Sequence, residues 1–96
     1  MDEQTIFVNQ PLHIEIETGV DLTGVSTTLI KFKKPNGASD SWTASVTDEK
    51  GGIIEYDVPK DILDVAGVWK FWASLDFGDG PYPGTVFEQE IFNEGE

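Results

Sequence analysis

The chain has 96 residues, no cysteine and a formal net charge of -12, from 18 acidic and 6 basic side chains. A chain of this length holds one hydrophobic core, so we expect a single domain over residues 1–96. Hydrophobic residues make up 39% of the sequence, which argues against a disordered chain. The absence of cysteine excludes disulfides and thiolate chemistry, and it favours a reducing compartment.

The acidic composition also bears on partners. A strongly negative protein repels phosphate backbones, and its only cluster of basic residues is Lys31, Lys33 and Lys34, so nucleic acid is a poor partner. No segment approaches the run of about 20 apolar residues that a membrane-spanning helix requires, and no signal-peptide pattern is present. We expect a soluble protein with no membrane partner. The charge itself serves either solubility or an acidic face that docks a basic partner.

Short runs in which apolar and polar residues alternate predict β-strands in the first half of the chain. We interpret residues 6–8, 12–17, 28–34 and 42–46 as strands, each with alternate side chains facing the core. The third and fourth are expected to form a hairpin, because residues 34–37 supply a proline and an Asn-Gly pair for the turn.

The second half continues the same pattern, with strands predicted at residues 53–58, 68–77 and 85–92. The run 68–77 is the longest, so we expect it to be the central strand. Residues 61–67 have the spacing of one helical turn, residues 78–84 are expected to form a loop, and the acidic tail 93–96 is expected to fray.

Six or seven short strands with no long helix predict an all-β fold. Because no helix is available to cover a sheet, a second sheet must do so. We therefore predict an immunoglobulin-like antiparallel β-sandwich of six or seven strands, with a small closed barrel as the alternative.

Groups suited to catalysis or metal binding are scarce. Nucleophilic catalysis needs a base, and the single histidine, His13, is predicted to face solvent on an early strand. With one histidine and no cysteine, only a calcium site of oxygen ligands is conceivable, and Asp76 and Asp79 are its candidates. Their spacing lacks the regular ligands of a calcium loop, so we interpret them as a hairpin turn. We predict no catalytic residues, no metal and no cofactor, and hence no enzyme.

One surface stands out as a candidate contact site. Strict alternation along residues 68–77 places Trp72 on the outward face with Val68 and Lys70. Tryptophan is enriched at interface centres, so we predict partner binding there and include Tyr82 and Phe92 in the tentative site. In the alternative interpretation, Trp72 is internal packing under the N-terminal segment or under the loop that holds Tyr82.

Four motifs occur in order along the chain: GVDLTG at 19–24, IKFKKPNG at 30–37, WTA at 42–44 and DVAGVW at 64–69. Together they resemble the small immunoglobulin-like proteins of tailed phages and prophages, and they are similar to the N-terminal domain of phage baseplate upper proteins. The resemblance spans roughly residues 14–92.

The resemblance implies a non-enzymatic structural protein of the virion, acting in the tail, baseplate or fibre attachment and assembled in the host cytoplasm. Its partners would be other virion structural proteins. The particle would set its oligomeric state, which leaves the isolated chain free to be a monomer.

Three other functions stay open at this stage. A head decoration protein needs the same kind of compact acidic module. An acidic inhibitor that mimics nucleic acid would line one surface with carboxylates, whereas these are spread over several predicted strands and turns. A carbohydrate-binding module would stack sugars on exposed Trp72 and Tyr82.

Overall fold

The computed structural model describes residues 6–84 and 86–93, and the regular structure in them is entirely β-strand. The strands are β1 (Ile6–Phe7), β2 (Leu12–Glu17), β3 (Thr27–Lys33), β4 (Ser39–Thr43), β5 (Ser45–Asp48), β6 (Ile53–Val58), β7 (Gly67–Asp76), β8 (Pro81–Pro83) and β9 (Phe87–Phe92). Across this part of the chain, no helix has the length and apolar character needed to cross a membrane.

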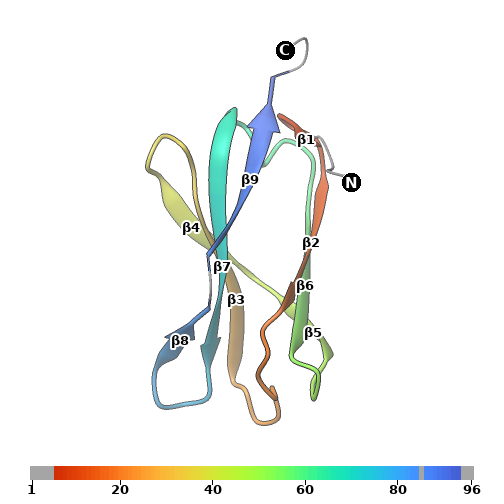
Figure 1. The fold of residues 1–96 in the computed structure, drawn as a ribbon, viewed down its shortest axis with the longest axis vertical. Coiled ribbons are helices and arrows are strands. Elements are labelled where there is room, and N and C mark those ends of the chain that lie inside the picture. The colour runs from red at the N-terminus through yellow and green to blue at the C-terminus, as the bar shows by residue number, and fades with distance from the viewer. Residues whose placement is uncertain (1–5, 85, 94–96) are drawn as a thin grey trace.

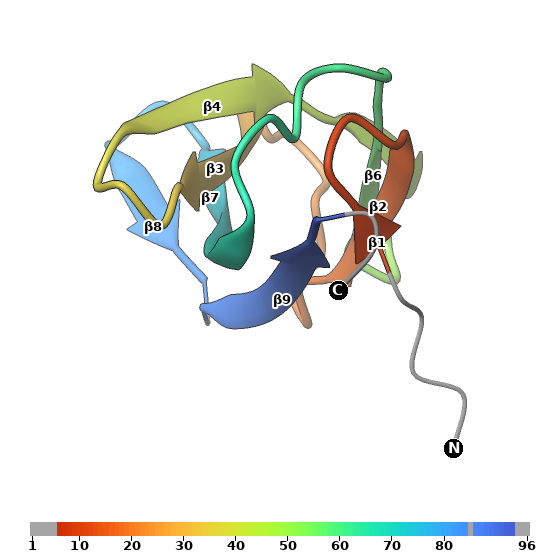
Figure 2. The same cartoon turned by 90° about the horizontal axis from the view of Figure 1, so that it is seen from above.

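The strands form two sheets. The larger has the order β1-β9-β7-β3-β4, with β8 paired to the end of β7, and the smaller has the order β2-β6-β5. Only β1 and β9 pair in parallel; the other pairs are antiparallel. The two sheets stand upright in Figure 1, and the view from above shows that they curl around a shared interior (Figure 2). The prediction of an all-β, sandwich-like fold is confirmed.

Apolar side chains from both sheets fill this interior. The largest that are fully buried are Trp69, Phe71, Ile6, Leu22, Ile30, Ile54, Leu63, Ile91 and Val58. An aromatic stack links the sheets: the ring of Trp42 lies 4.3 Å from that of Phe32 and 5.1 Å from that of Tyr56. Stacked aromatic pairs of this kind contribute about 0.5 to 1.5 kcal/mol beyond the area they bury.

The alternation of side chains gave correct faces for most strands. β2 and β6 have the predicted bounds, and β7 begins one residue earlier than predicted. On β7 the buried residues Trp69 and Phe71 face the core, while Val68 and Lys70 are exposed. The period of two therefore placed the central strand in the correct register.

The predicted strand at residues 42–46 is wrong, because the chain changes sheet in the middle of it. β4 belongs to the larger sheet and β5 to the smaller, with only Ala44 between them. Ala44 is held by Thr28, whose hydroxyl donates to the Ala44 carbonyl at 2.9 Å and whose own carbonyl accepts from the Ala44 amide at 3.0 Å. Beyond this corner Val46 pairs with the fully buried Ile54 and so points to the core side of the smaller sheet, although on the edge strand β5 it is exposed.

The predicted helical turn at 61–67 is also absent from the structure. Its backbone bonds to the turn after β1: the Asp61 amide donates to the Asn9 carbonyl, and the Asn9 amide donates to the Leu63 carbonyl. Leu63 is fully buried, whereas Ile62 is exposed. The apolar residues of this segment therefore belong to a loop, which packs Leu63 into the core.

The predicted loop 78–84 contains a further strand, since β8 pairs with β7. With β5 and β8 added, the described residues hold nine strands, more than the six or seven predicted. The final strand begins at Phe87, later than predicted. Residue 85, where the prediction starts this strand, lies outside the described residues. So do residues 94–96, which make up most of the tail that was predicted to fray.

Candidate protein-contact face

The outer face of the larger sheet carries most of the predicted contact residues. Directly paired residues on adjacent strands point to the same side of a sheet. Trp72 on β7 lies opposite Lys31 on β3, and Lys70 lies between Lys33 on β3 and Glu88 on β9. We call the set Lys31, Lys33, Val68, Lys70 and Trp72 the outer lysine face.

The outer lysine face holds three of the chain's six basic residues. Lys33 and Lys70 are exposed and directly opposite one another, an arrangement of like charges that destabilises a strand pair. Within the described residues, Lys31, Lys33 and Lys70 form no salt bridge. In a protein of net charge -12, these lysines gather on β3 and β7, while the exposed Glu88 and Glu90 of β9 lie on the same side of the sheet, opposite Lys70 and Val68.

Trp72 is half-buried on this face, and its neighbours are polar. It lines an open hollow of about 480 Å³ with Lys31, Lys33, Ser39 and Ser41. The hollow lies beside β3 and β4, which supply most of the residues that line it. Neither β1 nor the β8 hairpin is among the residues that line it.

A second hollow on the same face lies over the turn between β3 and β4. It measures about 550 Å³, and Lys33 and Lys70 line it together with Pro35, Val68 and Glu88. Lys33 lines both hollows.

Phe92 and Tyr82 do not join this face in the same way. Phe92 is half-buried at the far end of β9, where it pairs with Phe7 of β1. Tyr82 lies opposite Leu75, a core-facing residue, and therefore faces the other side of the sheet from Trp72. Trp72 and Tyr82 do not form one sugar-stacking platform.

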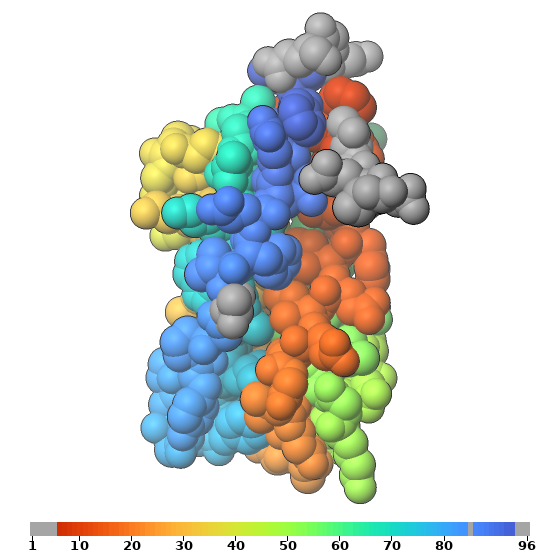
Figure 3. Space-filling model, viewed as in Figure 1, coloured from red at the N-terminus to blue at the C-terminus, as the bar shows by residue number. Residues whose placement is uncertain are grey.

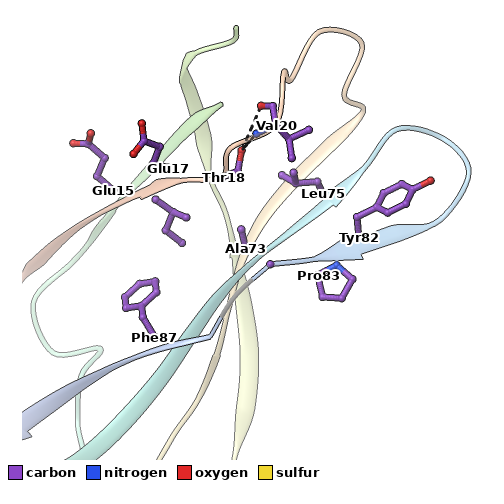
Figure 4. Close-up of a pocket in the computed structure, with 11 residues that line it drawn as sticks. Glu15, Glu17, Thr18, Val20, Ala73, Leu75, Tyr82, Pro83 and Phe87 are labelled. Carbon is purple, nitrogen blue, oxygen red and sulfur yellow. Dashed lines mark hydrogen bonds between the residues drawn. The ribbon is translucent and has the colours of Figure 1, made fainter. Parts of the chain in front are cut away.

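Tyr82 instead borders a groove along one open seam between the two sheets. The groove measures about 430 Å³ and is lined by residues of β2, its following loop, β7, β8 and β9 (Figure 4). In the space-filling view, β8 and β9 lie on one side of this seam and β2 with its loop on the other (Figure 3). Sequence reasoning missed the groove because it depends on which strands border the seam.

The predicted hairpin turn at Asp76 and Asp79 is confirmed by the pairing of β7 with β8. Asp76 accepts a hydrogen bond from the Gly78 amide at 2.7 Å, and Asp79 accepts one from the Tyr82 hydroxyl at 2.7 Å. The Asp79 hydrogen bond raises the pKa of Tyr82 above its usual value of 10.0, because the carboxylate stabilises the protonated phenol.

The outer face of the smaller sheet has the opposite character. His13 and Glu15 of β2 lie opposite Asp57 and Glu55 of β6, respectively. The Nδ1 atom of His13 lies 2.5 Å from a carboxylate oxygen of Asp57, and Nε2 lies 3.5 Å from one of Glu55. His13 is exposed, as predicted, but the sequence did not indicate that three carboxylates surround it.

One lysine of the predicted basic cluster has a structural role. The Lys34 ammonium donates to the Asp64 carboxylate at 3.0 Å and lies 5.4 Å from the centre of the Trp69 ring. The hydrogen bond to Lys34 lowers the pKa of Asp64 below 3.8. Lys34 therefore belongs to the loop packing around Trp69.

We expect an Asp64→Asn variant to reveal this pair in the pH dependence of stability. A lowered folded-state pKa stabilises the protein above pH 3.8 and stops doing so as the pH falls through the folded value. The wild type should therefore be more stable than the variant near neutral pH, and the difference should shrink in acid. Thermal unfolding of both proteins over an acid pH series measures this, and a difference independent of pH would contradict it.

Comparison of the chain with protein-family models, with curated proteins and with solved structures finds no match.

Proposed function

We propose that this chain is an immunoglobulin-like domain that acts as a non-enzymatic structural subunit of a phage tail, baseplate or fibre attachment, and that it binds a neighbouring virion protein through the outer lysine face. The proposal combines three kinds of support: strand topology, the motifs of the sequence, and the chemistry of that face. The observation that carries the contact site is the outward-facing, half-buried Trp72 beside Lys31, Lys33 and Lys70, which form no salt bridge within the described residues.

The strand order supports the immunoglobulin-like assignment. In immunoglobulin domains one sheet contains the neighbours G, F, C and C′ and the other contains B, E and D. Here β9, β7, β3 and β4 are neighbours in the larger sheet, and β2, β6 and β5 are neighbours in the smaller. Taken in chain order, β2 to β7 correspond to strands B, C, C′, D, E and F, and β9 corresponds to strand G.

A corner at the start of β7 also supports it. Immunoglobulin-like domains carry a tyrosine near the start of strand F that hydrogen-bonds to the backbone a few residues upstream. Trp69 occupies the comparable position, and its indole N–H donates to the Val65 carbonyl at 2.8 Å. Phe71, two residues later, takes the core position that a disulfide cysteine holds in antibody domains.

The motifs that resemble phage proteins lie at the turns and corners of this topology. Asp21 accepts hydrogen bonds from the amide and hydroxyl of Thr23, as expected of a local Asx turn. Gly37 has a φ of 92° in the turn between β3 and β4. Gly67 has a φ of 127° and lies against Pro35, so two of the motifs meet in space.

The chemistry of the outer lysine face indicates what partner it fits. Aromatic residues lead the list of interface anchors, and an anchor needs a surrounding rim that excludes water. Lys31 and Lys33 favour carboxylates on the partner, because neither lies opposite an acidic residue within the sheet. We therefore infer a partner surface with acidic residues around an apolar pocket for Trp72.

A pair of variants tests the contact. Trp72→Ala is expected to leave the isolated domain folded and to weaken association with the neighbouring subunit by about 2 kcal/mol or more if the residue is a hot spot. Tyr82→Ala is the matched control, since it removes an exposed aromatic ring from the opposite side of the sheet. Circular dichroism reports folding, and incorporation into particles assembled from the remaining structural proteins reports binding.

Normal incorporation of a folded Trp72→Ala variant would sink the proposed contact site. Equal loss with both variants would mean that the effect is not specific to this face. A Trp72→Ala variant that does not fold would show that the indole is a packing residue between β7 and β3, and would equally overturn the assignment.

A further inference from the structure

The cluster around His13 has the composition of a metal site that the sequence did not reveal. His13 and Glu15 are two residues apart on β2, so their side chains leave the same face of the strand. Glu55 lies directly opposite Glu15 on β6. One ligand atom from each of the three lies within 4.8 Å of the other two.

The imidazole is oriented for coordination. Nδ1 faces the Asp57 carboxylate at 2.5 Å and Nε2 faces Glu55 at 3.5 Å. Histidines that bind metals commonly donate their second ring N–H to a carboxylate, which fixes the ring and its tautomer. With Nδ1–H directed to Asp57, Nε2 keeps its lone pair and lies on the side of Glu55.

The spacing around Nε2 suits a shared cation better than a direct hydrogen bond. At 3.5 Å the Nε2 to Glu55 separation exceeds the usual hydrogen-bond range of about 2.7 to 3.2 Å. Tetrahedral zinc, with ligands at about 2.0 to 2.2 Å, places neighbouring ligand atoms roughly 3.3 to 3.6 Å apart. Glu15 is exposed, so its carboxylate is free to rotate toward the same point.

A cation would also relieve an unfavourable arrangement in the sheet. Glu15 and Glu55 are like charges directly opposite one another, which destabilises a strand pair.

From this geometry we propose that His13, Glu15 and Glu55 form a surface site for a divalent cation of the zinc type, with Asp57 as the residue that orients His13. Imidazole nitrogen is a ligand that zinc accepts and that calcium, which prefers oxygen, does not select. Three protein ligands leave at least one coordination position for water or for a group of a partner protein.

Titration calorimetry with zinc chloride on the purified chain tests the site. We expect one zinc ion per chain and an affinity at least tenfold weaker in His13→Gln and in Glu55→Gln. Glu88→Gln is the matched control, because it makes the same charge change on the outer face of the other sheet and should bind zinc as the wild type does. Asp57→Asn should weaken binding by about 10- to 100-fold, the usual effect of losing an orienting carboxylate.

Nitrogen NMR of the side chain supplies a second readout that does not depend on folding of a variant. The chain has one histidine, so its ring nitrogens are assigned without ambiguity, and zinc should shift Nε2 far more than Nδ1. Zinc binding of equal strength in the wild type and His13→Gln, an unshifted Nε2, or no saturable binding would each overturn the proposal. Calcium binding that is insensitive to His13→Gln, without zinc binding at His13, would point to surface carboxylates alone and would overturn it as well.

Discussion

Trp69→Ala is expected to lower the free energy of unfolding by about 3 to 5 kcal/mol, the range for removing a large buried aromatic side chain. Trp69 is fully buried in the interior between the sheets, and its ring lies 5.6 Å from that of Phe32. Its loss would also leave the Val65 carbonyl without the indole donor. Since small domains have only about 5 to 15 kcal/mol of stability, much of the fold's stability would be lost.

Two further variants divide this effect into its parts. Trp69→Phe keeps an aromatic ring and removes the hydrogen bond to Val65, so we expect a smaller loss of about 1 to 3 kcal/mol. Trp72→Ala, three residues along the same strand, is the matched control and should cost less than Trp69→Ala because Trp72 is only half-buried. Chemical denaturation with a common slope measures all three. A greater loss in Trp72→Ala than in Trp69→Ala would mean that the register of β7 is shifted by one residue.

Gly52→Ala is expected to be the most damaging single-methyl change, at about 2 kcal/mol or more. Gly52 has a φ of 75°, which L-residues rarely adopt, and its carbonyl accepts hydrogen bonds from both the amide and the hydroxyl of Thr18. A Cβ atom there would lie against the Val20 carbonyl and 2.7 Å from the Thr18 hydroxyl. The turn between β5 and β6 would have to move away from the loop after β2.

A Gly19→Ala variant separates the strain of a positive φ from the steric clash of the added Cβ atom. Gly19 has nearly the same φ, 73°, but a Cβ atom there would meet nothing within 4 Å, so this variant measures the backbone strain alone. Thermal unfolding of the two variants beside the wild type gives the cost of the close approach as their difference. Equal losses would show that the loops are free to separate without penalty.

Alternation in the sequence located three strands closely, including β2 at the edge of the smaller sheet. β2, β6 and β7 each keep one face in the core over their whole length, so the pattern and the structure agree. The pattern did not reveal that one run of alternating residues, 42–46, is divided between two strands. At Ala44 the chain passes from one sheet to the other, and no local residue type marks such a corner.

The short strand β8 was missed for a different reason. Pro81 and Pro83 argue against a central strand, because proline cannot donate to the ladder. β8 pairs only with β7 and ends the hairpin, and an edge strand tolerates both prolines. The orientation of Tyr82 depends on this pairing, so it was not accessible from the sequence.

The candidate sites divide in the same way. The outward position of Trp72 and Lys70 follows from the alternation of side chains along one strand, and this alternation can be read from the sequence. The cluster of His13 and Glu55 depends on the register between β2 and β6, which are far apart in the chain and whose alignment no local pattern specifies.

The parallel pairing of β1 with β9 determines how the domain would carry a mechanical load. Ile6 pairs with Ile91 and Phe7 with Phe92, and the Val8 amide extends the ladder to the Phe92 carbonyl at 2.9 Å. Because the strands run the same way, tension between the start of β1 and the end of β9 would slide one strand along the other. These hydrogen bonds would then share the force and rupture together, whereas in a peeled hairpin they would break one after another.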